Sequence, residues 1–408
     1  MIGRLERGDE PDFPEFVDAF GGHFPLLNRL GSTQQDPIWH AEGDVGRHTA
    51  MVLQEAYKQL SEADFALSSH ERLAVILGAL FHDIAKPVTT RQKMIAGKER
   101  IVAPRHADQG RSYLAYKLSG LGLAPTVVDM VLALVGHHHD PKHLVIDTPD
   151  PRAFWRLGRL ANPGLLYLLE QADMRGRICE DRQEQIEYID LFRLYAQDSE
   201  IWNGGAPHLK WKPFIDDALS EFDEELRQLT FATALRDAEA GTISTPEEAI
   251  ARSYRFREGF SNLVVLCGPS GSGKTTWALQ NLEGYGLISM DDLREELTGN
   301  AEDQSKNGQV LQLARERLRE YLRAKRPVIW DATNLRRDFR RVPIELGFDY
   351  GAYVRLVVFQ LPEKLLASRI AARERRVTDG VLEKQLSGLQ FPYADEAHEL
   401  EIIRPHLD

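Results

Sequence analysis

The stretch from Leu263 to Thr276, LVVLCGPSGSGKTT, constrains the fold more than any other part of the sequence. Residues 263–266 favour a strand, a glycine-rich turn follows, and residues 275–282 favour a helix. The turn contains the full pattern G-x-x-x-x-G-K-[ST], in which glycines let successive backbone N–H groups face phosphate oxygens. An ordinary Gly/Ser loop before a helix is the alternative, but the strand, loop and helix occur in the order that the motif requires. The sequence therefore predicts a site for the phosphates of a nucleoside triphosphate.

The polar residues of this loop have expected roles. Lys274 is placed to reach the β- and γ-phosphates, and the Thr275 hydroxyl is placed to bind Mg²⁺. We therefore expect ATP or another nucleoside triphosphate, with Mg²⁺, as the cofactor. The residues expected to contact it are Gly268, Ser270, Gly271, Ser272, Gly273, Lys274, Thr275 and Thr276.

The rest of the carboxy-terminal half predicts an α/β domain with a parallel sheet, because strand patterns alternate with helix patterns. The strands are expected at 287–289, 327–331 and 353–360, and the helices at 308–324 and from residue 362. Such a sheet binds ligands at the carboxyl ends of its strands, where Asp291, Arg294 and Asp331 are expected. Phosphoryl transfer to a hydroxyl needs a carboxylate for the proton, a cation for the acceptor and arginine over the γ-phosphoryl group. The arginines available for the last role are Arg369, Arg373, Arg375 and Arg376.

Histidine is concentrated in the amino-terminal half, which we expect to be mostly helical. Apolar residues recur there at helical spacing in 45–60, 71–81, 112–118 and 126–135, and no alternating pattern is long enough to predict a sheet. The segments GDVGRHTAMV, ALFHDIAKP, PRHADQG and LVGHHHDP hold most of the histidines, and EQADMRGR adds the carboxylate of Asp173. Imidazole and carboxylate are the ligands that borderline divalent metals prefer. Because His82 and Asp83 would diverge on a helix by about 100°, they can share a metal only at a helix end or kink.

The ordered set of His48, His82 with Asp83, and Asp173 resembles the ligand set of the HD phosphohydrolase superfamily. The segments WHAEGDVGRHT, HDIAKP and ADMRGR resemble the HD domains attached to bacterial tRNA nucleotidyltransferases, although nothing in this half resembles a polymerase domain. The resemblance implies one or two divalent transition metals, Mn²⁺, Co²⁺, Ni²⁺ or Zn²⁺, with Asp83 bridging a pair. The implied ligands are His48, His82, Asp83, His106, Asp173 and one of His137, His138 and His139, with His138 preferred.

Lys86 is a further candidate in this half. It lies one helical turn past His82 and is expected to neutralise a bound phosphate. A solvated lysine at a helix end is the alternative interpretation.

The segments GPSGSGKTTW, SMDDLR, DATNLRR and RIAAR resemble the 5′-polynucleotide kinase domain of phage and bacterial end-healing enzymes. By this resemblance Asp291 is the general base, Arg294 grips the acceptor phosphate and Arg373 is the lid arginine. The sequence departs from that family after the lid, where VTDGV stands in place of V-P-x-x-V. For Asp291 and Arg294 the alternative is a helix-capping carboxylate with its ion pair.

Together the two halves resemble bacterial HD domain–polynucleotide kinase fusions, which implies the healing of broken RNA. The implied activities are ATP-dependent phosphorylation of 5′-OH ends of RNA or DNA and metal-dependent removal of 2′,3′-cyclic, 2′ or 3′ phosphate, with a separate RNA ligase as partner. A small-molecule kinase fused to a nucleotide phosphohydrolase, and an ATP-gated HD regulatory switch, are the alternatives; a homodimer is left open. We expect an HD domain at 1–180, a helical linker at 181–260 with helices at 183–195, 214–230 and 246–257, and a kinase domain at 261–408.

Composition limits the partners and the compartment. The formal net charge of −12 excludes a surface that is basic throughout, so nucleic acid requires local basic patches. With only Cys179 and Cys267, no apolar signal segment and no run of about 18 apolar residues, we expect a cytoplasmic protein that does not associate with a membrane. The arginines expected to form a positive surface on the kinase half are Arg315, Arg317, Arg319, Arg323, Arg336, Arg337, Arg340 and Arg341.

Overall fold

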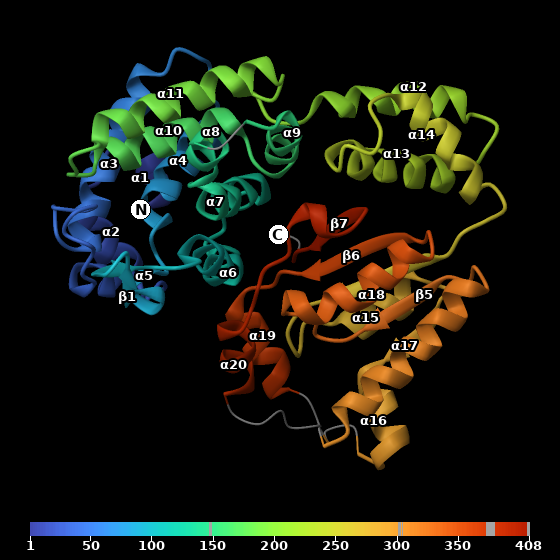
Figure 1. Ribbon diagram of the computed structural model, residues 1–408. Helices are drawn as coiled ribbons and strands as arrows, with labels where there is room; N and C mark the ends of the chain where they lie inside the picture. Colours follow the sequence, from blue (N-terminus) through green and yellow to red (C-terminus); the bar gives the residue numbers. More distant parts are fainter. Residues whose placement is uncertain (147–148, 301–302, 304, 373–379, 406–408) are drawn as a thin grey trace. The chain divides into compact units, whose positions relative to one another are not determined.

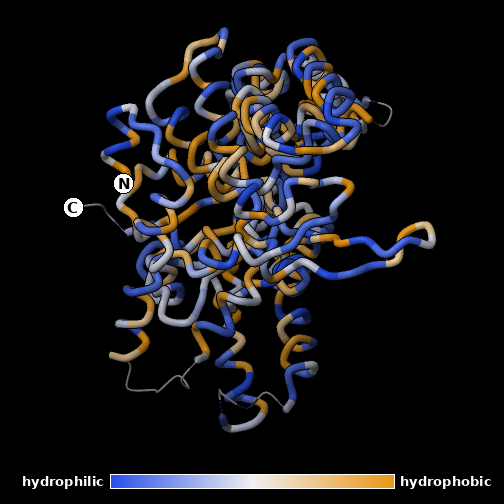
Figure 2. The backbone as a smooth tube through the Cα atoms, turned by 90° about the vertical axis from the view of Figure 1, so that its left-hand side faces the viewer, coloured by the Kyte–Doolittle hydropathy of each residue, from blue (hydrophilic) through white to orange (hydrophobic). Residues whose placement is uncertain are grey.

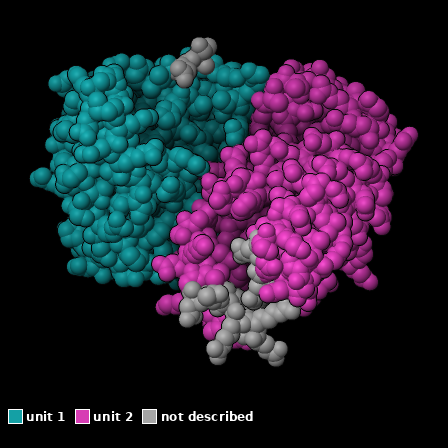
Figure 3. Space-filling view, turned by 60° about the horizontal axis from the view of Figure 1, so that its bottom comes forward, with its two compact units in different colours: residues 1–207 teal, residues 208–408 magenta. Residues whose placement is uncertain are grey.

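The computed structural model describes residues 1–146, 149–300, 303, 305–372 and 380–405. The chain forms two compact units, residues 1–207 and 208–408, which are coloured separately in Figure 3. The segment predicted as a helical linker, 181–260, is divided between them: its first helix belongs to the first unit and the others belong to the second. No helix among the described residues is long and apolar enough to cross a membrane.

The first unit is built from helices around one buried helix, α4 (Ser69–Phe81). A capping box between Ser68 and Glu71 starts α4, and all its residues from Leu73 to Phe81 are buried. Helices α3, α7 and α10 pack against it. The helices of this unit are α1 (Ile2–Glu6), α2 (Phe13–Phe20), α3 (Val45–Glu62), α4, α5 (Lys86–Thr89), α6 (His106–Leu118), α7 (Pro125–His137), α8 (Asp140–Ile146), α9 (Pro151–Leu160), α10 (Pro163–Arg175) and α11 (Arg182–Asp198).

A β-hairpin interrupts the helices, although the sequence predicted no sheet in this half. Strands β1 (Arg91–Ile95) and β2 (Lys98–Val102) pair antiparallel, and Figure 2 shows the two-stranded arm projecting from the body of the chain. Ala96 and Gly97 form the turn, both with positive φ (48° and 75°), which matches the right-handed twist of a tight hairpin. The prediction was wrong because β1 is exposed along its whole length, so its residues do not alternate between apolar and polar.

The second unit begins with a helical subregion that has a core of its own. It contains α12 (Trp211–Ala218), α13 (Glu224–Glu239) and α14 (Pro246–Arg252), packed around buried residues such as Leu226 and Leu229. The helix predicted at 214–230 is therefore two helices. The chain breaks between them because the Asp223 carboxylate caps α13, accepting a hydrogen bond from the Leu226 N–H at 2.7 Å.

A five-stranded parallel sheet follows, in the order β4-β5-β3-β6-β7, which confirms the predicted α/β domain (Figure 1). Its central strand, β3, is a nearly continuous buried apolar run, as expected for a parallel strand covered on both faces. The strands are β3 (Asn262–Cys267), β4 (Gly286–Ser289), β5 (Val328–Asp331), β6 (Tyr353–Phe359) and β7 (Glu399–Ile403), the last of which the sequence did not suggest. The helices are α15 (Lys274–Asn281), α16 (Met290–Thr298), α17 (Asn307–Arg323), α18 (Arg337–Asp349), α19 (Glu363–Ala371) and α20 (Val381–Ser387).

Candidate functional site

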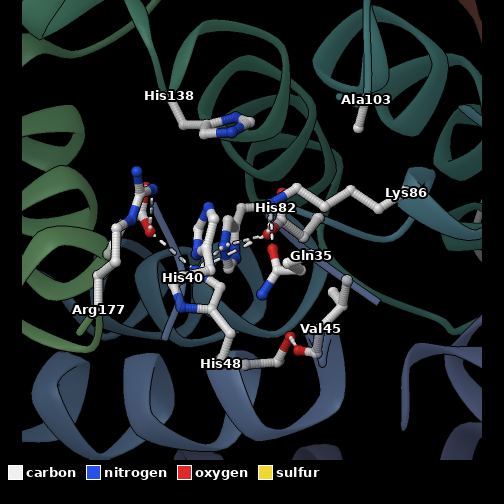
Figure 4. Close-up of polar contacts among 12 residues, drawn as sticks. Gln35, His40, Val45, His48, His82, Lys86, Ala103, His138 and Arg177 are labelled. Atoms are coloured by element: carbon white, nitrogen blue, oxygen red, sulfur yellow. Dashed lines mark hydrogen bonds and ion pairs between the residues drawn. The ribbon is translucent and has the colours of Figure 1, made fainter. Parts of the chain in front are cut away.

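Histidines and carboxylates from five separate places in the first unit meet at one buried centre (Figure 4). Helix α4 ends at Phe81, so His82 and Asp83 stand in the turn after it, at a helix end as their adjacency requires. The remaining predicted ligands are His48 on α3, His106 at the start of α6, His138 at the end of α7 and Asp173 on α10. All of them are at least nine-tenths buried.

Asp83 lies in the middle of this centre, with its two oxygens turned toward different histidines. Oδ2 lies 3.2 Å from Nε2 of His82, whereas Oδ1 lies 3.2 Å from Nε2 of His106. On the first side, Nε2 of His48 lies 3.4 Å from Nε2 of His82 and 2.9 Å from Oδ1 of Asp173. On the second side Nε2 of His106 and Nε2 of His138 are 3.3 Å apart. A carboxylate shared in this way fits the bridging role predicted for Asp83.

The hydrogen bonds of the imidazole rings show that these atoms suit a metal. The Nδ1 atoms of His82, His106 and His138 each lie 2.7–2.9 Å from the backbone carbonyl three residues earlier. Since a carbonyl only accepts, Nδ1 carries the proton and Nε2 presents a lone pair to the centre. Two lone pairs that face each other cannot form a hydrogen bond, and neither can a lone pair that faces a carboxylate oxygen. One added proton would satisfy only some of these nitrogen and oxygen atoms. The donor set therefore fits divalent cations between the facing atoms.

Charges at the edge of the centre keep both carboxylates ionised. Burial opposes ionisation, but Lys86 beside Asp83 and Arg177 beside Asp173 hold the pKa of each carboxyl well below its usual range. Nζ of Lys86 is 2.7 Å from Oδ2 of Asp83 and donates to Gln35 Oε1 at 2.7 Å. Lys86 begins α5 rather than extending the helix of His82, and it is buried, so it is not the solvated lysine of the alternative interpretation.

The three consecutive histidines after α7 differ in their surroundings. His138 faces the centre, and burial lowers its pKa well below the usual value, which keeps the ring neutral. His137 bonds through Nδ1 to Asp140 Oδ2 at 2.7 Å. His139, which the sequence interpretation did not select, brings its Nε2 to 3.1 Å from Nε2 of His106. The second side of the centre therefore has two histidines of this run within reach, not one.

A second layer, which the sequence did not reveal, supports His48. Oε1 of Glu42 lies 3.0 Å from Nδ1 of His48 and 2.8 Å from Nδ1 of His40. The other oxygen of Glu42 accepts from the Ile178 N–H at 3.0 Å, so the segment that follows α10 fixes this carboxylate. A carboxylate behind a ligating histidine fixes the ring's orientation and raises its basicity. The segment WHAEGD contains His40 and Glu42, but only the fold shows that their side chains face His48.

A pocket of about 370 Å³ opens over the centre. Its wall includes the aromatic ring of Trp39 and the positive side chains of Lys86, Lys142 and Arg177. The ligand-centre histidines His106 and His139 also line it. A pocket with positive walls above a bridging carboxylate fits an anionic substrate such as a phosphate ester.

The phosphate loop of the second unit has the conformation that its glycines permit. Gly271 and Gly273 have φ of 80° and 88°, and a Cβ at Gly271 would approach Ile370 Cγ1 to 2.8 Å. Helix α15 starts at Lys274, so its first N–H groups point into the loop. Nζ of Lys274 lies against the loop itself, donating to the carbonyl of Gly268 at 2.9 Å.

The sheet brings three predicted site residues to the same edge. Ser289 pairs with Asp331 in the register of β4 and β5, so Asp291 at the start of α16 is close to Asp331. The Thr275 hydroxyl donates to Asp331 Oδ2 at 2.5 Å. Burial raises the pKa of Asp331, and the nearby carboxylates of Asp291 and Asp292 add to this effect, which fits an oxygen site for Mg²⁺. The exposed Asp291 is paired with Arg294, three residues later.

Two further residues reach the phosphate loop from the helices that follow β6. Nη1 of Arg369, on α19, lies 3.4 Å from the carbonyl of Ser272. The amide of Gln385, on α20, bonds both to the Ser270 N–H and to its hydroxyl, each at 2.9 Å. The predicted lid arginine, Arg373, lies outside the described residues, as do Arg375 and Arg376.

Four of the eight arginines expected to form a positive surface are in ion pairs. Arg340 does not belong to that surface: it is buried and its guanidinium holds Glu396 through two bonds, at 2.6 and 2.7 Å. It also donates to the carbonyl of Leu335, so it fixes the loop that follows β5. Arg317 pairs with Glu296, Arg336 with Asp338 and Arg341 with Glu345. The prediction was wrong for Arg340 because Glu396, which is distant in sequence, packs against this face of α18.

Comparison with known proteins agrees with this division. Residues 45–172 match the HD domain family, and residues 263–392 match an AAA domain family. The chain thus joins a helical region similar to HD domains to a phosphate-loop region similar to kinase-like AAA domains. With the metal-type centre and the phosphate loop described above, this supports a fused hydrolase and kinase that acts on nucleotide-related substrates.

Two curated relatives are multifunctional CCA proteins. The one from Haemophilus ducreyi is 24% identical over 172 residues, covering 40% of this chain and 38% of its own length. The one from Shewanella frigidimarina is 26% identical over 188 residues, covering 44% of this chain and 40% of its own length. The chain thus spans about two fifths of the length of these relatives.

Proposed function

We propose that this protein heals broken nucleic-acid ends. The second unit would transfer the γ-phosphate of ATP to a 5′-hydroxyl, and the first would remove a 2′,3′-cyclic, 2′ or 3′ phosphate. The observation that carries the proposal is the Asp291–Arg294 pair at the strand edge that also holds the phosphate loop and Asp331. A carboxylate and a guanidinium beside a nucleotide site suit an acceptor that has both a hydroxyl and a phosphate.

In the second unit each residue has one task. The phosphate loop and Lys274 bind the nucleotide phosphates, and Thr275 with Asp331 would hold Mg²⁺, which screens the phosphate charge when bound. Asp291 accepts the proton of the attacking hydroxyl. Arg294 holds the phosphate on the 3′ side of the terminal nucleotide and so aligns the hydroxyl with Asp291. Arg369 is placed to contact the transferred phosphoryl group, because its guanidinium already contacts the Ser272 carbonyl of the phosphate loop.

In the first unit the residues would bind and orient a terminal phosphate. His48, His82, Asp83 and Asp173 would hold one divalent cation, and Asp83, His106 and His138 or His139 a second. Such cations, when bound, supply Lewis-acid polarisation of the phosphate and activation of water. Lys86, Lys142 and Arg177 line the pocket and neutralise the phosphate, while Glu42 holds His48 in the required orientation.

The kinase is tested with γ-labelled ATP and three acceptors: a short RNA with a 5′-hydroxyl, a free nucleoside and a panel of sugars. We expect label on the RNA, a very poor reaction with the nucleoside, and loss of most of the rate on RNA in Arg294→Ala. Arg152→Ala, which removes an exposed arginine from α9, is the matched control and should keep full activity. Label on sugar or nucleoside but not on RNA would replace end healing with a small-molecule kinase.

The phosphatase is tested with RNA that ends in a 2′,3′-cyclic or 3′ phosphate, after metal removal and addition of Mn²⁺, Co²⁺, Ni²⁺ or Zn²⁺. Release of phosphate should require one of these ions and should be lost in His82→Ala. The same measurement with and without ATP separates the proposal from an ATP-gated switch. A rate that depends on ATP when the RNA already has a 5′-phosphate would favour the switch.

A further inference from the structure

The β-hairpin of the first unit presents all its positive charges on one face. The register pairs Lys93 with Arg100, and Arg91 and Lys98 stand two residues from these along their strands. Because side chains alternate between the faces of a strand, these four residues share one face. The opposite face holds Gln92, Met94, Glu99 and Ile101, which include no cation. The arm therefore has one strongly basic face, in a chain whose net charge is −12.

This arrangement weakens the hairpin by itself. Like charges directly opposite each other in an antiparallel pair are destabilising, and Lys93 and Arg100 form such a pair. A two-stranded hairpin is at best marginally stable in water, and every residue of β1 is exposed. The repulsion among the positive charges of the exposed hairpin is relieved when an anionic partner binds and neutralises them.

The basic face is continuous with the pocket over the histidine centre. Arg100, on that face, lies 3.1 Å from Asp36 Oδ1 and 5.2 Å from the centre of the Trp39 ring. Both Asp36 and Trp39 line the pocket, as do Ile101 and Val102 at the base of β2. The Ile101 N–H also donates to Asp36 Oδ2 at 3.1 Å, so the base of the arm is fixed to the pocket wall. A chain that leaves the pocket can therefore pass directly onto the basic face.

We propose that this face binds the phosphate backbone of a single-stranded polynucleotide whose 3′ end occupies the pocket, an inference that rests on the proposed function of the first unit. The partner is a polyanion with regularly spaced phosphates, which Arg91, Lys93 and Lys98 contact in succession. The arm thus selects a polynucleotide end over a free nucleotide with the same terminal phosphate. Ile95, exposed at the tip on the same face, supplies apolar surface for an unstacked base.

The test compares two charge-matched variants of the full chain. Lys93→Gln with Lys98→Gln removes two positive charges from the basic face, and Gln92→Glu with Met94→Glu changes the charge equally on the opposite face. Substrates are a 2′,3′-cyclic mononucleotide and a short RNA with the same cyclic end. For the first variant we expect KM on the RNA to rise about tenfold, with kcat and the mononucleotide kinetics unchanged. The slope of log KM for RNA against log salt concentration should fall by about 0.7 for each phosphate contact that is lost.

Several outcomes would overturn this proposal. These are an unchanged KM on RNA, an equal rise on the mononucleotide, and an equal effect of the opposite-face variant. Sedimentation with phosphatidylserine vesicles that depends on Lys93 and Lys98, with RNA kinetics unaffected, would assign the arm to a membrane surface instead. If the wild type hydrolyses neither substrate, the proposed phosphatase fails. Anisotropy of a fluorescent 3′-phosphorylated RNA then decides the arm alone, and the inference fails if the two variants bind it equally.

Discussion

His398 should make the second unit sensitive to acid. Its Nδ1 accepts a hydrogen bond from the Val354 N–H at 3.1 Å, so a proton on this nitrogen would break a contact between β6 and the segment before β7. Burial lowers the pKa of His398 from 6.5 to about 3, and the positive charges of Arg236 and Arg255 contribute to this shift. The ring also packs against Phe348 and Tyr353. The folded state therefore holds this histidine neutral.

The sign and size of the effect follow from the two pKa values. In the unfolded chain His398 takes up a proton below about pH 6.5, whereas the folded chain does not until about pH 3. The stabilisation is therefore fully present above pH 6.5 and is lost as the pH falls. Between pH 6.5 and about 4.5 the shift corresponds to about 2.3 kcal/mol at most. Because the ring keeps some contact with solvent, we expect about 1–2 kcal/mol.

Hydrogen exchange on peptides from β6 measures this loss in the second unit alone. The free energy of opening should fall with pH more steeply in the wild type than in His398→Asn, whose amide oxygen can replace Nδ1 as the acceptor without taking up a proton. Carboxylates that titrate in the same range cancel in the difference between the two proteins. Parallel profiles, agreeing within about 0.5 kcal/mol, would refute the reasoning.

Three other results are expected. Lys274→Ala should abolish transfer of phosphate from ATP and leave phosphate release intact, while His82→Ala should do the reverse, because the two sites lie in different units; loss of both activities in either variant would contradict this. After chelation and dialysis the hydrolase should recover with Mn²⁺, Co²⁺, Ni²⁺ or Zn²⁺, whereas the kinase should work with Mg²⁺. The reason is that imidazole prefers the transition metals, while hydroxyl and carboxylate oxygens suit Mg²⁺. Full hydrolase activity in Mg²⁺ alone would contradict this difference in metal preference. Arg340→Met should cost about 3–5 kcal/mol in a urea titration, because it strands the buried Glu396, and adding Glu396→Leu should recover most of that loss; equal stability of the single and double variants would disprove the role of the pair.

Several features could be predicted because they are encoded locally. The phosphate loop needs particular glycines, a lysine and a hydroxyl at fixed spacing, so the sequence from Gly268 to Thr275 predicts a conformation and a chemistry together. Strands β3 and β5 are continuous buried runs whose burial does not depend on register, and they were recognised for the same reason, whereas β7, with the sequence ELEII, is only partly buried and was not recognised. Likewise, the adjacency of His82 and Asp83 is enough to require a helix end, which is where α4 stops.

Other features depend on how distant elements pack, and only the tertiary structure decides them. Which of His137, His138 and His139 face the centre is set by where α7 ends against α6, and the sequence offers three equal side chains. Glu42 supports His48, and Arg340 is buried against Glu396, because segments distant in sequence lie over them. The basic face of the hairpin depends on the pairing register, since a shift of one residue would turn half of its charges to the other side. The sequence by itself determined the kinds of chemistry and, except for the β-hairpin and β7, the kinds of element, because these depend on neighbouring residues. The convergence of side chains depends on contacts between residues far apart in the chain.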